Sequence, residues 1–251
     1  MAGTQGRLLV LLSLTALLLI SSTPVFAATE LPPDLRMMRL SDLTIEDTVD
    51  GRRLLRFSAV IVNVGLGPLK LEASRNGSSS QMKVQQRIYD DTGVSRAVST
   101  SAKMIFGGDG HTHWHVKNMV RHVVVGIDDT AVRQLGNKRG FCLFDNEIKD
   151  LQLPGAPQGP VFTTSNTCNG NISSLSTEMG LSVGWGDKYG FRLPDQYVDI
   201  TKLNPGRYRL RAIADAGTWF IEADETNNFT YVDFQLNADG TMTVLKYGPS
   251  A

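Results

Sequence analysis

Residues 56–64 read Arg-Phe-Ser-Ala-Val-Ile-Val-Asn-Val, a run rich in β-branched and apolar side chains. The run is followed by Gly65, Gly67 and Pro68, residue types that interrupt regular structure and form turns. β-Branched residues favour strands because their restricted side chains pack well on a pleated surface. The stretch therefore predicts a buried β-strand followed by a turn.

The same two-residue period recurs in other parts of the chain. Residues 207–214 alternate arginine with apolar residues, as expected for a strand with one wet and one buried face. Residues 82–88 carry Met, Val and Ile at strand spacing, and residues 234–244 predict a hairpin around Asn-Ala-Asp-Gly. Because no long amphipathic helix pattern is present, the sequence predicts an all-β fold, an antiparallel β-sandwich with long irregular loops.

The composition fits one globular domain. The chain has 251 residues, 41% of them hydrophobic, which is enough to bury a core. Basic and acidic side chains number 25 each, so the basic charge typical of nucleic-acid-binding proteins is absent. We therefore expect no nucleic-acid partner. The two cysteines exclude a four-cysteine zinc site and a disulfide-dense scaffold.

The N-terminus has the three parts of a secretory signal peptide. Arg7 precedes an apolar run over residues 8–20, and small residues lead up to Ala27. A transmembrane anchor is the alternative, but the run is shorter than the roughly 20 residues that span a bilayer. We predict a signal peptide at 1–27, a mature domain at 28–251 without an integral membrane segment, and a secreted, extracellular or periplasmic location.

Export bears on the two cysteines, because disulfides persist outside the cytoplasm. We predict a disulfide between Cys142 and Cys168, with two buried free thiols as the alternative. Residues 146–182 are rich in Pro, Ser, Thr, Asn and Gly and predict a long irregular excursion. The disulfide would tie this excursion down.

Three of the four histidines fall in His111-Thr112-His113-Trp114-His115, at the start of a strand-like run that continues to Val125. In one continuous strand these imidazoles would share a face at intervals of about 6.6 Å. Histidine sets that leave coordination positions open are typical of catalytic metal sites, and nitrogen ligands suit copper or zinc. A polar surface cluster or ordinary core histidines are the alternative. Three of four histidines at this spacing favour a metal site.

Several motifs together resemble the lysyl oxidase family, copper amine oxidases that carry a lysine tyrosylquinone made from their own side chains. The resemblance covers most of residues 33–236 and implies that residues 28–251 form a lysyl-oxidase-like catalytic domain. The matching segments, in the order of the family, are His111-x-His113-x-His115, His122, Lys138-Arg139-Gly140-Phe141-Cys142-Leu143, Asp187-Lys188-Tyr189, Gln196-Tyr197-Val198-Asp199-Ile200-Thr201, Pro205-Gly206-Arg207-Tyr208 and Asp224-Glu225-Thr226-Asn227-Asn228.

The resemblance implies a role for each of these residue types. The histidine triplet would bind copper, and Lys138 and Tyr189 would form the quinone cofactor after O2 oxidises the tyrosine. The substrate would be a primary amine, either a protein lysine or a small amine, converted to an aldehyde with release of hydrogen peroxide and ammonia. From its polar sequence context alone, Lys138 would be an ordinary solvated surface lysine.

Two residues, Asp187 and His122, are candidates for the catalytic base. Asp187 precedes Tyr189 by two positions and would share its face in an extended segment, although a turn residue after Gly186 is the alternative. His122 could titrate near neutral pH. Strict alternation from His115 puts His122 on the opposite face, so either a β-bulge intervenes or His122 acts from behind the site.

A second, weaker metal site is suggested near the C-terminus. Glu222, Asp224, Asn227 and Asn228 supply the oxygen ligands that calcium prefers. Asp34 would join them if the two ends of the domain meet. The alternative is a polar turn held by side-chain hydrogen bonds to the backbone.

The leading functional hypothesis is a secreted copper- and quinone-dependent amine oxidase. One alternative is a non-enzymatic metal-binding β-sandwich of the cell exterior, because sandwiches host many functions. Another is a metal-dependent oxygenase or hydrolase that uses the three histidines with ordinary open-site chemistry. Lys138 and Tyr189 discriminate among the three, because only the first hypothesis requires both.

Overall fold

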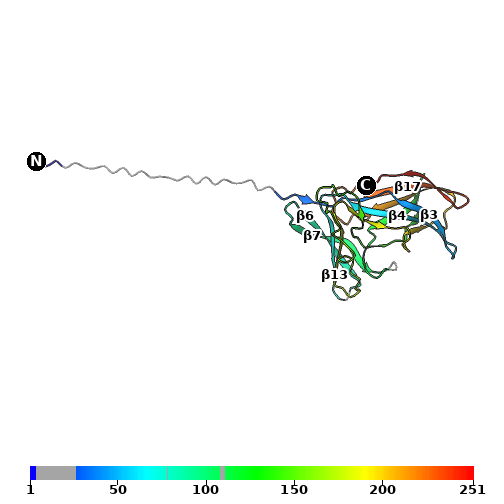
Figure 1. The fold of residues 1–251 in the computed structure, drawn as a ribbon, viewed down its shortest axis with the longest axis horizontal. Helices are drawn as coiled ribbons and strands as arrows, with labels where there is room; N and C mark the ends of the chain where they lie inside the picture. The colour runs from blue at the N-terminus through cyan, green and yellow to red at the C-terminus, as the bar shows by residue number, and fades with distance from the viewer. Residues whose placement is uncertain (4–26, 78, 108–110) are drawn as a thin grey trace.

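A computed structural model describes residues 1–3, 27–77, 79–107 and 111–251 (Figure 1). Most of the predicted signal peptide at 1–27 lies outside these residues. The described part of the chain holds strands, turns and loops and no helix, and thus no helix that could cross a membrane. Its strands form three antiparallel sheets, so the predicted all-β antiparallel fold is confirmed.

The strand predicted at residues 56–64 is the central strand of a six-stranded sheet. β4 (Arg53–Asn63) is buried over almost its whole length, and Ile61 and Val62 are fully buried. A strand with both faces covered is mostly apolar, and in β4 the polar Ser58 and Asn63 are buried as well. The strands that pair with it or extend its sheet are β2 (Leu35–Met37), β3 (Ser41–Asp47), β12 (Glu147–Ile148), β14 (Trp185–Tyr189) and β15 (Tyr197–Asp199).

The turn after β4 depends on its glycines. A Cβ atom at Gly65 would lie 2.4 Å from the backbone nitrogen of Asp34, and one at Gly67 would lie 2.1 Å from the backbone oxygen of Leu31. Both neighbours are backbone atoms, which cannot rotate away as a side chain can. The glycines therefore let the segment before β2 pack directly against the end of β4.

A seven-stranded sheet forms the second layer (Figure 1). The strand predicted at residues 82–88 lies within it, with Met82, Val84 and Ile88 buried on one face. Its members are β1 (Glu30–Leu31), β5 (Leu69–Ser74), β6 (Gln81–Asp90), β7 (Ser95–Phe106), β8 (Trp114–Lys117), β11 (Gly140–Phe141) and β13 (Ser176–Leu181).

The third sheet has five strands and contains the arginine-alternating segment. Tyr208, Leu210, Ala212 and Ala214 are buried while the arginines between them are partly or fully exposed, as predicted. The predicted closing hairpin is also present, with residues 237–240 as its turn. The strands are β9 (Val120–Gly126), β10 (Val132–Leu135), β16 (Gly206–Ala214), β17 (Phe229–Leu236) and β18 (Met242–Tyr247).

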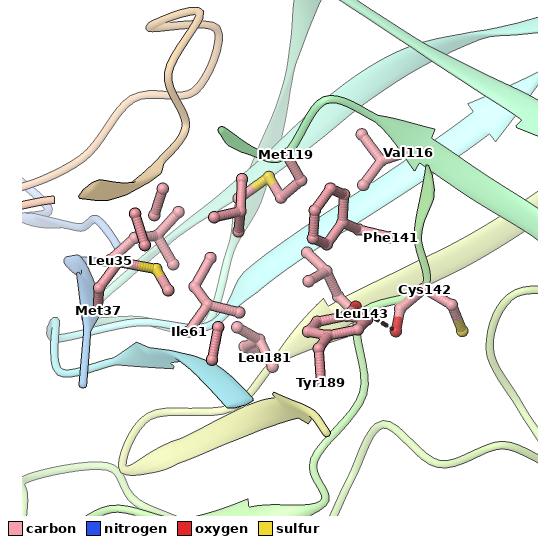
Figure 2. Packing of buried hydrophobic residues seen from close by; sticks show 14 of the residues in the cluster. Leu35, Met37, Ile61, Val116, Met119, Phe141, Cys142, Leu143, Leu181 and Tyr189 are labelled. Atoms are coloured by element: carbon pink, nitrogen blue, oxygen red, sulfur yellow. Dashed lines mark hydrogen bonds between the residues drawn. The ribbon is translucent and has the colours of Figure 1, made fainter. Parts of the chain in front are cut away.

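One apolar core joins the sheets. Figure 2 shows Leu35 and Ile61 of the six-stranded sheet in one cluster with Leu181, Val116 and Phe141 of the seven-stranded sheet. Apolar area removed from water contributes about 25 cal/mol per Å². The packing of this core therefore fixes the position of the sheets relative to one another. It also fixes the position of the loops that carry the polar residues of the site.

The 146–182 excursion is only partly irregular. Six residues near its end, 176–181, form β13, which pairs along its full length with β5. This strand was not predicted, because Ser-Thr-Glu-Met-Gly-Leu lacks the β-branched run that marks β4. The rest of the excursion is turns and loops apart from the two-residue β12.

The predicted disulfide between Cys142 and Cys168 is confirmed. It bridges a sequence separation of 26 residues, for which chain entropy alone gives about 3.5 kcal/mol. The backbone oxygen of Cys168 accepts a hydrogen bond from the nitrogen of Trp114, at 3.1 Å. The backbone oxygen of Cys142 accepts one from the Tyr189 hydroxyl, at 3.0 Å. The bond therefore links the excursion to both the histidine segment and β14.

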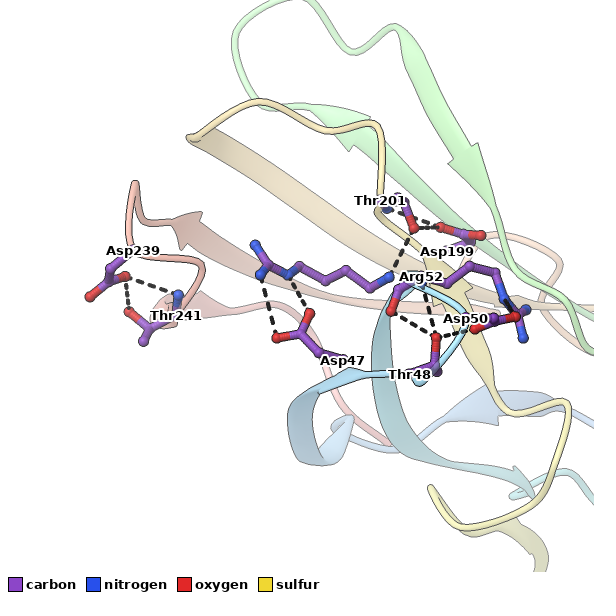
Figure 3. A network of polar contacts seen from close by, with 9 residues as sticks. Asp47, Thr48, Asp50, Arg52, Asp199, Thr201, Asp239 and Thr241 are labelled. Carbon is purple, nitrogen blue, oxygen red and sulfur yellow. Dashed lines mark hydrogen bonds and ion pairs between the residues drawn. The ribbon is translucent and has the colours of Figure 1, made fainter.

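An exposed polar network closes the β3–β4 hairpin (Figure 3). Arg52 Nε bonds to Asp50 at 2.9 Å, and the Thr48 hydroxyl bonds to the Arg52 carbonyl at 3.0 Å. The backbone nitrogen of Arg53 donates to the Thr201 hydroxyl at 2.9 Å. Exposed ion pairs contribute little to stability, about 0–1 kcal/mol each. The network serves to align the start of β4 with the end of β15.

Candidate functional site

The three clustered histidines come together at the start of β8. Their potential ligand nitrogens all lie within 4.8 Å of one another, and the ring centroids of His113 and His115 are 4.3 Å apart. His115 is buried, whereas His111 and His113 are half-buried. Neutral imidazoles at this separation can converge on one metal ion.

The strand geometry predicted for this segment is wrong. β8 begins only at Trp114, and a bend at residues 112–113 precedes it. The chain then turns at Asn118, whose φ is 57°, so residues 111–125 are not one strand. The bend rather than strand alternation gathers the imidazoles, and it brings their ring centroids to 4.3–5.9 Å instead of about 6.6 Å.

His122 lies apart from this cluster, on β9 of the five-stranded sheet. Its ring packs edge-on against Phe57 at 4.9 Å between centroids. Burial, assisted by the positive charge of Lys138, lowers the pKa of His122 to about 3. The turn after β8, rather than a bulge, separates it from the histidine cluster. At neutral pH His122 is uncharged, and a group with so low a pKa is a weak proton acceptor.

Lys138 is buried, in contrast to the surface position that its sequence context predicts. Its loop is held by a hydrogen bond from the nitrogen of Gly136 to the oxygen of His122, at 2.8 Å. A Cβ at Gly136 would lie 2.6 Å from the Cβ of His122, so this approach requires glycine. Nζ of Lys138 lies 4.9 Å from the centroid of the Tyr189 ring and 3.1 Å from an oxygen of Asp195. Asp195 was not predicted as a site residue.

Tyr189 is the last residue of β14 and is 7% exposed. Figure 2 shows its ring beside Phe141 and its hydroxyl directed at the backbone oxygen of Cys142. The Phe141 and Tyr189 rings meet edge to face, with centroids 5.1 Å apart. This packing fixes the plane of the ring that faces Lys138.

Asp187 occupies the same face of β14 as Tyr189, because Lys188 between them points to solvent. It is a strand residue paired with Ile61, which removes the alternative of a turn residue. One of its oxygens accepts a hydrogen bond of 2.6 Å from Asn146. Burial raises the pKa of Asp187 to about 7, against the lowering effect of hydrogen bonds from Tyr189 and Asn146 and of the Lys138 charge.

A cavity of about 410 Å³ is shared by the histidine cluster and these three residues. Lys138 also lines a second cavity of about 220 Å³ on its other side, together with His122 and Trp219. The structure thus places His111, His113, His115, Lys138, Asp187 and Tyr189 around one space. His122 does not line this cavity and shares only the second cavity with Lys138.

A family model described as Lysyl oxidase matches residues 79–246, about two thirds of the chain. The chain belongs to the lysyl oxidase family. Lysyl oxidase homolog 2 of Xenopus tropicalis is 28% identical over 183 residues, which cover 72% of this chain and 18% of that protein. Human Lysyl oxidase homolog 3 is 26% identical over 178 residues, covering 70% of this chain and 18% of that protein. This lysyl oxidase family chain therefore matches less than a fifth of the length of these relatives.

The oxygen-rich residues predicted as a second site lie where the two ends of the domain meet. An oxygen of Glu222 accepts a 2.6 Å hydrogen bond from the nitrogen of Leu35, and the other accepts one of 2.8 Å from Asn228. The Asn228 and Asp34 Oδ1 atoms are buried and have no hydrogen-bond partner within the described residues. Asp224 is exposed and bonds to Thr226, as in the polar-turn alternative.

Two further carboxylates near Glu222 were missed by the sequence reasoning. Asp215 and Glu225 each offer an oxygen within 4.8 Å of one on Glu222. Burial, together with these neighbouring charges, raises the pKa of Glu222 to about 9. Asp215 follows β16 and precedes Glu222 by seven positions, and only the folded turn between them shows that their carboxylates lie together.

Proposed function

We propose that this chain is a secreted, copper-dependent primary amine oxidase whose cofactor forms from Lys138 and Tyr189. In this proposal residues 1–27 are a signal peptide and residues 28–251 the catalytic domain. One observation carries it: the amine of Lys138 lies 4.9 Å from the Tyr189 ring centroid, in a cavity shared with three histidines. A metal-binding β-sandwich without activity would not need a buried lysine against a tyrosine ring.

The residues present fit a copper ion. Three imidazole nitrogens within 4.8 Å of one another leave coordination positions open on the cavity side. Copper heads the affinity order of divalent metals for nitrogen ligands. Bound there, copper would let O2 oxidise the Tyr189 ring, and the quinone completed by Lys138 would convert primary amines to aldehydes with release of ammonia and hydrogen peroxide.

The chain's own residues perform the remaining tasks. Phe141 and the Cys142 carbonyl hold the Tyr189 ring, so that one face is presented to Lys138. Asp187 is the candidate base that removes a proton from the substrate α-carbon, and Asn146 orients its carboxyl. Lys138, Asp187 and Tyr189 are themselves buried, and their removal from bulk water strengthens the polar interactions among them. The substrate would be a small amine or a protein lysine.

The proposal is tested by loading the purified protein with copper in air and mapping its peptides by mass spectrometry. We expect one cross-linked species that joins the Lys138 peptide to the Tyr189 peptide, together with peroxide release on addition of a simple alkylamine. Unlinked, unmodified peptides after full copper loading would refute the proposed cofactor.

Amine oxidation should have an acidic limb set by Asp187. A base acts in its deprotonated form, and the pKa of Asp187 is raised by burial to about 7. The rate should therefore fall roughly tenfold per pH unit below this value and level off above it. The measurement is peroxide release between pH 5 and pH 9, in wild type and in Asp187→Asn.

Asp187→Asn should retain the cross-link, because the amide keeps the shape of the carboxyl, but it should lose turnover at every pH. An unchanged acidic limb in this variant would assign the limb to another group and remove Asp187 as the base.

We also propose a calcium ion bound by Asp34, Glu222 and Asn228, with Asp224 and Asn227 of the adjoining turn. The buried oxygens without hydrogen-bond partners on Asp34 and Asn228 support this, as does the carboxylate cluster around Glu222. A cation would stabilise the charged form of Glu222, which burial and, to a lesser extent, the neighbouring carboxylates disfavour. It would also link the segment before β2 to the segment before β17.

Calcium should raise the melting temperature of the metal-free protein. At a concentration 100 times its Kd, binding only to the folded state adds about 2.7 kcal/mol, or roughly 5–10 °C for a domain of this size. Glu222→Gln should lose this increment, whereas Asp239→Asn, in the exposed β17–β18 turn, should keep it. An identical calcium response in wild type and Glu222→Gln would exclude the site.

A further inference from the structure

The amine of Lys138 is held by a buried carboxylate that the amine oxidase reaction does not itself require. Nζ of Lys138 is 3.1 Å from Oδ2 of Asp195, and the two side chains are 1% and 6% exposed. Burying a charged pair carries a desolvation cost, so such a pair is weak evidence for a purely stabilising role. Its position against a reacting residue points to a role in the reaction of that residue.

The backbone fixes this pair from both sides. Asp195 lies in the turn that connects Tyr189 at the end of β14 to β15. The Arg56 guanidinium donates hydrogen bonds to the oxygens of Phe191 and Leu193 and so anchors the turn, at 3.2 and 3.0 Å. One short segment therefore carries both the tyrosine and the carboxylate.

The lysine loop is tied to the same segment. The nitrogen of Asn137 donates to the oxygen of Tyr197 at 2.9 Å, and Gly136 forms a bridge with Val198. The backbone of the lysine loop therefore cannot shift relative to this segment without breaking these contacts, whereas the Lys138 side chain can still move. Besides Asp195, the titratable groups near its amine include the Tyr189 phenol, and Asp187 and His122, whose pKa values the lysine charge lowers.

The Lys138 side chain must bring its amine closer to the Tyr189 ring before the two can react. Reacting atoms in near-attack arrangements lie about 3–3.5 Å apart, and Nζ is 4.9 Å from the ring centroid. An ammonium group has no lone pair, so the amine must lose a proton before it can bond a carbon. Asp195 is hydrogen-bonded to the amine and can accept that proton.

We propose that Asp195 is the positioning residue for cofactor formation: it holds the Lys138 amine at the Tyr189 ring and accepts the proton that the amine must release. This inference rests on the proposed function, which supplies a Tyr189 ring already oxidised to the quinone level by O2 at copper.

Nζ of Lys138 gives one proton to the Asp195 carboxylate, and its lone pair forms a bond to a ring carbon. The ring gains the two electrons of this addition, and the hydrogen of the attacked carbon and one amine hydrogen pass to the ring oxygens. A further O2 removes these two electrons and two protons as hydrogen peroxide, which leaves the cross-linked quinone and a protonated Asp195.

The test compares wild type with Asp195→Asn and Asp195→Glu, and uses Asp199→Asn as the matched control. Asp199 lies four residues further on, and its carboxylate bonds to Thr201 rather than to a lysine. Metal-free melting temperature and copper content are measured first. Each protein is then exposed to copper and air, and peptides are mapped over time for the Tyr189 peptide and its cross-link to Lys138.

We expect Asp195→Asn to bind copper and oxidise Tyr189, seen as a gain of one oxygen and a loss of two hydrogens, but to cross-link about 100-fold more slowly. Raising the pH should speed the cross-link in this variant, because hydroxide replaces the missing acceptor. Asp195→Glu and Asp199→Asn should both cross-link readily. A purely structural role would change folding or copper content and would not separate tyrosine oxidation from cross-linking.

If Asp195→Asn cross-links at the wild-type rate, the role of Asp195 is overturned and the proposed function still stands. If this variant does not fold, Asp195→Glu carries the test, and a folded Glu variant that oxidises Tyr189 without cross-linking would also overturn it. A wild-type protein whose Tyr189 stays unmodified would instead overturn the proposed function, and this inference with it.

Discussion

Tyr189→Phe should abolish peroxide release from primary amines while copper binding and the fold are retained. Oxidation to the quinone requires the phenol oxygen, which becomes a carbonyl oxygen of the product. Phenylalanine lacks this oxygen. The ring itself still packs on Phe141, while the hydrogen bonds of the hydroxyl to the Cys142 carbonyl and to Asp187 are lost. Each such hydrogen bond contributes about 1 kcal/mol, a loss that a domain of this size tolerates. The measurement is peroxide release with an alkylamine after aerobic copper loading, beside copper content and thermal unfolding.

Lys138→Arg is the companion variant. It keeps a positive charge beside Asp195, but a guanidinium stays protonated to about pH 12 and cannot add to the ring. It should bind copper, lack the visible absorbance of the quinone and release no peroxide. Full activity in Tyr189→Phe would eliminate the quinone mechanism. A metal-only oxygenase or hydrolase, or a metal-binding sandwich, would then be the better explanation.

Replacing His115 by alanine should remove most of the bound copper and, with it, the cross-link. Its ring lies 4.3 Å from that of His113 and 5.9 Å from that of His111, so its loss leaves two imidazoles around the ion. Outer groups that only orient a metal ligand already contribute up to about 100-fold in affinity, and a direct ligand should cost more. Copper content after dialysis is measured for His111→Ala, His113→Ala and His115→Ala.

His122→Asn is the matched control for the histidine variants. This histidine is also buried, but it lies on β9 and outside the cluster of potential ligands. The His122→Asn variant should retain copper, whether or not its rate of amine oxidation changes. Full copper retention in all three single variants of the cluster would refute a shared site. Loss of copper in His122→Asn as severe as in the cluster variants would place His122 among the ligands.

Features with a short sequence period were predictable from the sequence alone. The β-branched run at 56–64, the arginine alternation at 207–214 and the hairpin at 234–244 all form the strands expected of them. Each of these patterns reflects which face of a strand is buried, and that information lies within a few neighbouring residues. The cysteine pair was predictable as well, because only one pairing of two cysteines exists. The order of motifs along the chain sufficed to predict the family.

The arrangement of the site required the tertiary structure. The bend before β8 and the turn at Asn118 break a segment that looks like one strand, and thereby gather three histidines and send the fourth to another sheet. Lys138 looks like a surface residue in its polar loop, yet it is buried against Asp195, which is 57 positions away. Such contacts depend on how sheets close over a shared core, not on local periodicity. The sequence was thus enough to predict β4, β16, the closing hairpin, the disulfide and the family, whereas the packing of the sheets decides which charged groups meet at Lys138.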